Sequence, residues 1–250
     1  MLGLGSQVKG HIERRFGMKW ESPGPKMRDV LAALRSIWRS WQTGEKLDFH
    51  GRFFKLDLMT PFFNPGPIGS PEIPIYVAGV NRGMYRLVGE VGNGLHVHPL
   101  HTIGYLKEIM MPALSQGLAN AQRKREDVVI AGSVFAAVGE NESQIRNVKE
   151  AYGSQIAFYA STRTYRKVME LHGWGDVADR LHEYSSRGEW DKMGTEINSE
   201  ILGEFVVEGT WAGIAREIKK KYGGVLDRVR LYLPFDGDSN WRAVADGFRE

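Results

Sequence analysis

A glycine-containing turn is the first candidate for binding chemistry in this sequence. The apolar run Ile73–Ala78 predicts a buried strand, and apolar residues at helical spacing predict a helix over Arg82–Val91. Gly79 and Gly83 lie in the turn between them, where a missing side chain lets another molecule approach the backbone. The first N–H groups of such a helix are unpaired and carry partial positive charge, which suits a phosphate. The spacing is not that of a dinucleotide-binding fingerprint, so an ordinary strand-to-helix loop is the alternative.

Two histidines lie in the next predicted strand, Leu95–His98, and a third, His101, follows it. His96 and His98 lie two apart, so both side chains point to one side of that strand. Histidine exchanges protons near neutral pH, and His98 is nearer to the strand's carboxyl end, so it is the candidate for assisting proton transfer. An interior histidine satisfied by its neighbours is the alternative. His101 is expected to be a solvated loop residue, and no carboxylate has the spacing to complete a metal site.

Alternating strands and helices must position these residues. Helices are predicted between the strands, including Thr102–Arg123 with Thr102 as N-cap and Thr210–Tyr222 with Thr210 as N-cap. This alternation predicts an α/β fold with a parallel sheet covered by helices. The predicted parallel strands are Leu2–Gly5, Ile73–Ala78, Leu95–His98, Val128–Val138 and Val229–Pro234. An eight-stranded barrel has a similar length of about 250 residues but needs three more strands.

Three further features concern the region before the glycine turn. A helix is predicted over Lys26–Trp41, and a hairpin turning at Gly51 follows it. The proline-rich stretch over residues 59–74 is expected to be an ordered loop, pinned by Phe62 and Phe63.

Composition excludes several classes of protein. Of the 250 residues, 42% are hydrophobic and 25% charged, which is ordinary for a globular domain with a sizeable core. The net charge of +3 is spread among interleaved acids and bases, so a nucleic-acid partner is not expected. The longest apolar stretch, Val128–Val138, is far short of the roughly 20 residues of a membrane helix, so no membrane partner is expected. The absence of cysteine excludes disulfides and thiolate chemistry and fits a cytoplasmic location.

A resemblance to a known family runs along essentially the whole chain. The sequence resembles the luciferase-like monooxygenase superfamily, and within it the branch of oxidoreductases that use the deazaflavin coenzyme F420. No single matching segment is specific for this family, but the set of segments in this order is. The segments that carry the resemblance are Leu2–Val8, His11–Gly17, Met27–Trp41, Asp48–Phe54, Met59–Pro67, Pro74–Pro99, Glu208–Thr210, Tyr222–Gly224 and Asp227–Val229.

The resemblance implies a (β/α)8 TIM barrel of the bacterial luciferase type, with only strands four to eight present. Leu2–Gly5 would correspond to the fourth strand of the family, and about three βα units that precede it there would be missing. Residues 1–250 would then form a single N-terminally truncated domain, with a helical insertion over about residues 141–208.

The resemblance also implies a function and a site. The expected activity is hydride transfer between a small organic substrate and F420, with His98 assisting proton transfer. The positions that match the family's cofactor ligands are Gly5, Ser6, Gln7, Ala78, Gly79, Val80 and Asn81. If the turn binds phosphate, Gly79→Val is expected to weaken cofactor binding more than stability. The alternatives are an FMN-dependent monooxygenase of the same fold, or a non-catalytic remnant that forms homo-oligomers through an exposed Leu2–Gly5 edge.

Overall fold

The computed structural model describes residues 1–233 and 240–249. Its chain divides into two compact units. Unit 1 comprises Met1–Leu95 and Ala113–Val128, and unit 2 comprises His96–Pro112 and Val129–Glu250. The strand β5 (Gly94–Val97) and the helix α4 (Met111–Asn120) each run from one unit into the other along the chain.

Parallel strands form the centre of unit 1. The strand β1 (Leu2–Leu4) pairs in parallel with β4 (Ile75–Gly79), and β4 lies between β1 and β5 in the strand order. Side chains of β4 are buried except that of Ala78. The helix α2 (Arg82–Val91) has the predicted bounds and buries the apolar face that its spacing indicated.

The C-terminal end of α2 is fixed by two arginines. Arg123 donates to the carbonyl oxygens of Gly89 at 2.9 Å and Gly92 at 2.7 Å, and Arg35 donates to that of Val91 at 2.6 Å. The last carbonyls of a helix lack intrahelical partners and carry partial negative charge, so cations here stabilise the helix and hold its position.

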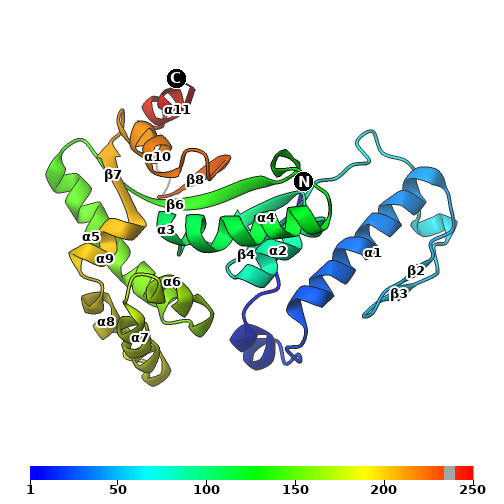
Figure 1. Cartoon of the computed structure of the whole chain (residues 1–250), viewed down its shortest axis with the longest axis horizontal. Helices are drawn as coiled ribbons and strands as arrows, with labels where there is room; N and C mark the ends of the chain where they lie inside the picture. The colour runs from blue at the N-terminus through cyan, green and yellow to red at the C-terminus, as the bar shows by residue number, and fades with distance from the viewer. Residues whose placement is uncertain (234–239, 250) are drawn as a thin grey trace. The chain divides into compact units, whose positions relative to one another are not determined.

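A second helix carries a small hairpin in unit 1. The helix α1 (Pro23–Thr43) is capped at its C-terminal end by Gly44, whose φ of 75° is left-handed. The strands β2 (Phe49–His50) and β3 (Lys55–Leu56) are antiparallel, which confirms the predicted hairpin (Figure 1).

The loop before β4 corrects one expectation. A single 3-10 turn, η2 (Pro61–Phe63), interrupts it. Phe62 and Phe63 are 90% and 72% exposed, so the prediction that they pin this loop is wrong. Their rings contact each other edge to face, 5.1 Å between centroids, instead of packing against the core.

Unit 2 is built on the long strand β6 (Val129–Gly139), drawn in green in Figure 1. The strand β8 (Arg228–Tyr232) pairs in parallel with its first half, and β7 (Val206–Thr210) pairs in parallel with its second half. The strand β7 was not among the predicted strands. Pro234, the predicted last residue of the final strand, lies outside the described residues.

Helices make up most of the rest of unit 2. Thr102 accepts from the Tyr105 N–H, as predicted for an N-cap. The predicted cap at Thr210 is wrong because that helix begins four residues later, although the Thr210 hydroxyl does accept from the Gly213 N–H. The helical segments are α3 (Ile103–Tyr105), η3 (Leu106–Met110), α5 (Glu142–Ala160), η5 (Arg163–Tyr165), α6 (Arg166–Glu170), α7 (Gly175–Arg187), α8 (Trp190–Met193), η6 (Gly194–Glu196), α9 (Ser199–Phe205), α10 (Ile214–Tyr222) and α11 (Trp241–Arg249).

The observed elements confirm the expected α/β fold class with parallel strand pairing. Among the described helices, none combines the length and the apolar character that crossing a bilayer requires.

Candidate functional site

The carboxyl ends of β1 and β4 bring together two predicted cofactor-binding segments in unit 1. Because the two strands are parallel and in register from Leu2 with Ile75, the residues that follow them emerge at the same edge. A Cβ atom built on Gly5 would lie 3.6 Å from the Cβ of Ala78 and would meet no other atom within 4 Å. Both residues are exposed, so small side chains leave the backbone at this edge accessible.

The segment after β1 has an unusual backbone conformation. Gln7 has a φ of 59°, in the left-handed region that is unfavourable for a residue with a side chain. Its side-chain oxygen accepts from the Val8 N–H at 3.2 Å, and its carbonyl accepts from the Ser6 hydroxyl at 3.4 Å. A conformation of this kind costs about 1–3 kcal/mol.

The start of α2 is open to solvent. Asn81 caps the helix, its side-chain oxygen accepting from the Met84 N–H at 3.1 Å. Asn81, Arg82 and Gly83 are exposed, and the first turn contains no acidic residue. The N-terminal partial charge of α2 is therefore available to an anion, with the cationic Arg82 in the same turn.

Gly79 lies in a tightly packed part of unit 1. A Cβ atom at this position would lie 3.0 Å from Cδ1 of Leu95 and 3.3 Å from Met84 and Tyr85 side-chain atoms. A side chain at this position would therefore require neighbouring side chains of unit 1 to shift. A Gly79→Val change would therefore also lower stability, and its expected effect on cofactor binding stays a prediction.

His98 lies in unit 2 just after β5, half-buried among aromatic rings. Its ring centroid lies 4.3 Å from that of Tyr165 and 4.8 Å from that of Tyr159. Nδ1 accepts from the Leu100 N–H at 3.1 Å, so the proton of the neutral ring is on Nε2. Burial, followed by the nearby His101 and His96, lowers the pKa of His98 to about 4. At neutral pH His98 is therefore a hydrogen-bond donor through Nε2.

His101 is buried, with 2% of its surface exposed, so the expectation of a solvated loop residue is wrong. Its Nδ1 lies 2.8 Å from the carbonyl oxygen of His98 and donates to it, since a carbonyl can only accept. Nε2 has no partner among the described residues. Burial is the main cause that lowers the pKa of His101 to about 4. His96, in contrast, is exposed.

Tyrosine hydroxyls next to His98 were not singled out by sequence. The hydroxyls of Tyr159 on α5 and Tyr232 on β8 lie 3.0 Å apart, although 73 residues separate them in the chain. The Tyr152 hydroxyl lies within hydrogen-bond distance of the carbonyl oxygens of Ala136 and Tyr232, which share its single proton. Burial raises the pKa of Tyr152 to about 12, and burial with the Tyr232 hydrogen bond raises the pKa of Tyr159, so both stay protonated. No local pattern could have identified these contacts.

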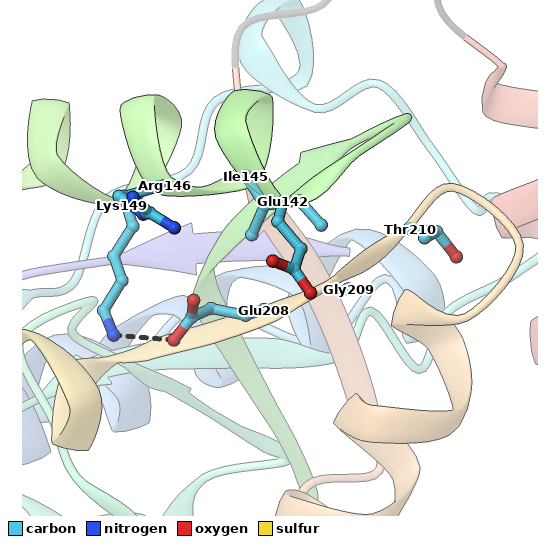
Figure 2. Close-up of a pocket in the computed structure, with 7 residues that line it drawn as sticks. All are labelled: Glu142, Ile145, Arg146, Lys149, Glu208, Gly209 and Thr210. Carbon is cyan, nitrogen blue, oxygen red and sulfur yellow. Dashed lines mark hydrogen bonds and ion pairs between the residues drawn. The ribbon is translucent and has the colours of Figure 1, made fainter.

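A shallow groove lies between α5 and β7 in unit 2 (Figure 2). Lys149 spans it, with Nζ 2.6 Å from a carboxylate oxygen of Glu208. The remaining lining contributes one further acid, Glu142, and one further base, Arg146, so charges of opposite sign balance there. The lining residues are Glu142, Ile145, Arg146, Lys149, Glu208, Gly209 and Thr210.

Metal binding has no structural support in the part of the chain that is described. No three histidine, aspartate or glutamate side chains come together there in a manner that could hold an ion.

Comparison with known proteins gives relatives over most of the chain. A protein of Mycobacterium tuberculosis named only as uncharacterised is 43% identical over 229 residues, which are 92% of this chain and 67% of that protein. The 5,10-methylenetetrahydromethanopterin reductase of Archaeoglobus fulgidus is 25% identical over 215 residues, which are 84% of this chain and 60% of the reductase.

The fold has solved counterparts. The coenzyme F420-dependent tetrahydromethanopterin reductase from Methanopyrus kandleri superposes with a TM-score of 0.74 at 18% identity, covering 99% of this chain and 72% of the reductase. The family model described as luciferase-like monooxygenase matches residues 1–228. The chain therefore belongs to the luciferase-like monooxygenase family.

Proposed function

We propose that this protein is an oxidoreductase that transfers a hydride between an organic substrate and the deazaflavin coenzyme F420. Similarity to reductases, one of them named as F420-dependent, supports the general kind of activity. The observation that carries the proposal for this chain is the exposed, acid-free start of α2 beside the small residues Gly5 and Ala78.

The residues of this edge fit a cofactor that carries a phosphate. The first N–H groups of α2, together with Arg82, suit the phosphate, and Asn81 fixes where the helix begins. The small side chains of Gly5 and Ala78 allow a bulky group to approach the backbone. When bound, F420 would supply the hydride chemistry, while the protein binds, orients and excludes water.

Rigidity of α2 supports its proposed binding role. Asn81 holds the N-terminal end of the helix, and Arg35 and Arg123 hold the C-terminal end. A helix fixed at both ends presents its first N–H groups without reorganisation when an anion arrives, and such preorganisation favours binding.

The role of His98 remains a prediction. The lowered pKa and the Nδ1 contact to Leu100 leave a neutral imidazole whose Nε2–H can donate a hydrogen bond to a substrate oxygen. This favours a positioning hydrogen bond over proton transfer at neutral pH, because a group with a pKa near 4 is a weak base there.

The decisive test compares Gly83→Asp with Gly83→Asn. A Cβ at Gly83 meets only the Asn81 side-chain oxygen, at 3.4 Å, so both side chains fit. An aspartate in the first turn is favourable for the helix but repels a phosphate bound there. We expect titrations followed by fluorescence to show F420 affinity roughly tenfold lower for Gly83→Asp than for Gly83→Asn. The thermal midpoint of Gly83→Asp should be no lower.

Parallel titration with FMN separates the alternatives. Preference for F420 supports the proposal, whereas preference for FMN would replace it with a flavin-dependent monooxygenase. Binding of neither cofactor, or equal F420 affinity in both Gly83 variants, would overturn the proposed site at α2.

A further inference from the structure

An unpaired arginine lies beside the tyrosine pair of unit 2. Arg230 belongs to β8 and is exposed. Among the residues described, no carboxylate pairs with it and no hydrogen bond to its side chain is formed. Arg230 and Tyr232 are two residues apart on one strand, so their side chains share a face of β8.

The neighbouring strand places only a small side chain opposite Arg230. Ser133 of β6 is the register partner of Arg230, just as Phe135 is the partner of Tyr232. The rings of Phe135 and Tyr232 lie 4.8 Å apart, which confirms that paired positions share this face. Because serine is small and uncharged, β6 provides neither a counter-ion nor a bulky cover for the guanidinium.

The tyrosine pair leaves one hydroxyl proton unused. Two hydroxyls that are hydrogen-bonded to each other share one bond but have two protons. The structure gives Tyr159 and Tyr232 no further hydroxyl partner within the described chain. One of them can therefore donate to a third group, and the raised pKa of Tyr159 keeps it protonated.

His98 adds a second neutral hydrogen-bond donor next to the Tyr159–Tyr232 pair. Its ring meets Tyr159 edge to face, and its Nε2–H makes no hydrogen bond among the described residues. Arg230, Tyr159, Tyr232 and His98 thus combine one cation with neutral donors, and within residues 1–233 and 240–249 no acidic side chain is hydrogen-bonded to them. The groove in Figure 2 differs because Lys149 is already paired with Glu208 there.

We propose that Arg230, the Tyr159–Tyr232 hydroxyl pair and His98 form a binding face for an organic carboxylate with an apolar body. A guanidinium matches a carboxylate with two parallel hydrogen bonds, and neutral hydroxyl and imidazole donors can satisfy its remaining lone pairs. The rings of Tyr165 and Tyr159 border the donors and suit the apolar part of such a molecule. This proposal rests on unit 2 alone and requires no cofactor.

The test uses benzoate as the probe and benzamide, of the same shape but uncharged, as its matched control. We expect calorimetric or ligand-observed NMR titration of the whole chain to show at least tenfold tighter binding of benzoate. Arg230→Gln should reduce the affinity for benzoate to that for benzamide. Arg230→Lys should have an intermediate affinity, because it keeps the positive charge but loses the two parallel N–H donors of the guanidinium. Tyr159→Phe should weaken benzoate binding several-fold.

Arg216→Gln is the control variant. Arg216 is highly exposed on α10 and already pairs with Glu217, so its loss should leave benzoate binding unchanged. Gly83→Asp should also leave it unchanged, which separates this proposal from the proposed F420 site. Undetectable benzoate binding, equal affinity for both probes, or full binding by Arg230→Gln would each overturn the proposal.

Discussion

The hydroxyl of Tyr152 on α5 lies 3.1 Å from the carbonyl oxygen of Ala136 on β6. This contact occurs close to where β6 changes partners, because Phe135 is paired with Tyr232 of β8 and with Val206 of β7. The same hydroxyl also reaches the Tyr232 carbonyl. One hydroxyl from α5 thus shares its proton between two backbone oxygens at the junction of the strands of unit 2.

Removal of this hydroxyl should destabilise the protein. Tyr152→Phe removes the side-chain donor that one buried and one part-buried carbonyl oxygen share, which costs about 1–3 kcal/mol. Urea unfolding followed by circular dichroism measures the loss. Tyr184→Phe is the control, since the Tyr184 hydroxyl has no hydrogen bond among the described residues, and it should change stability by less than about 0.5 kcal/mol. Equal effects of the two changes would contradict this role for Tyr152.

The hairpin of unit 1 should depend on one carboxylate. Asp29 of α1 accepts from the N–H groups of Arg52, Phe53 and Phe54, the shortest distance being 2.7 Å to Phe53. Asp29→Ala is expected to cost about 1–2 kcal/mol and to speed amide exchange at these three residues. Asp48→Ala, which removes only an exposed pair with His50, is the control and should leave the exchange rates unchanged.

Gly79→Ala should reduce stability through packing. Its Cβ would approach Leu95 at 3.0 Å, and an overpacked core typically costs about 1–3 kcal/mol. Gly10→Ala is the matched control, because a Cβ there meets nothing within 4 Å. Thermal unfolding of both variants measures the difference, and an unchanged midpoint for Gly79→Ala would show that Leu95 yields at little cost.

Stability should fall in mild acid because of His101. Its folded pKa of about 4 lies below the ordinary value of 6.5, so the unfolded chain binds the proton more readily. The contribution is fully present above about pH 6.5 and is lost progressively as the pH falls to about 4, on the order of 3 kcal/mol in total. Urea unfolding between pH 7.5 and 4.5 measures this slope.

His101→Gln should make that slope shallower. His11→Gln, which changes an exposed histidine of unit 1, should keep the slope of the unaltered protein. If His101→Gln leaves the slope unchanged, other groups are responsible for the acid sensitivity.

Local patterns predicted most elements correctly. The helix Arg82–Val91 has the predicted bounds, because its apolar spacing, the Asn81 cap and Gly92 all act within a few residues. The strand β7 was missed, because Val206–Thr210 is short and follows a helix directly. Its partner β6 lies some 70 residues earlier in the chain. Pairing with a distant strand, and not local propensity, decides such a segment.

The candidate site residues also divide into those that local patterns predicted and those that long-range contacts decided. The sequence by itself determined the α/β class, the turn at Asn81 and the choice of His98 as a candidate functional residue. Residue type and local spacing are sufficient for these predictions. Only the tertiary structure decided that Gly79 is tightly packed, that His101 is buried, and that Tyr159 meets Tyr232 beside Arg230. Burial and long-range contacts depend on which distant elements pack together, and no local spacing records that choice.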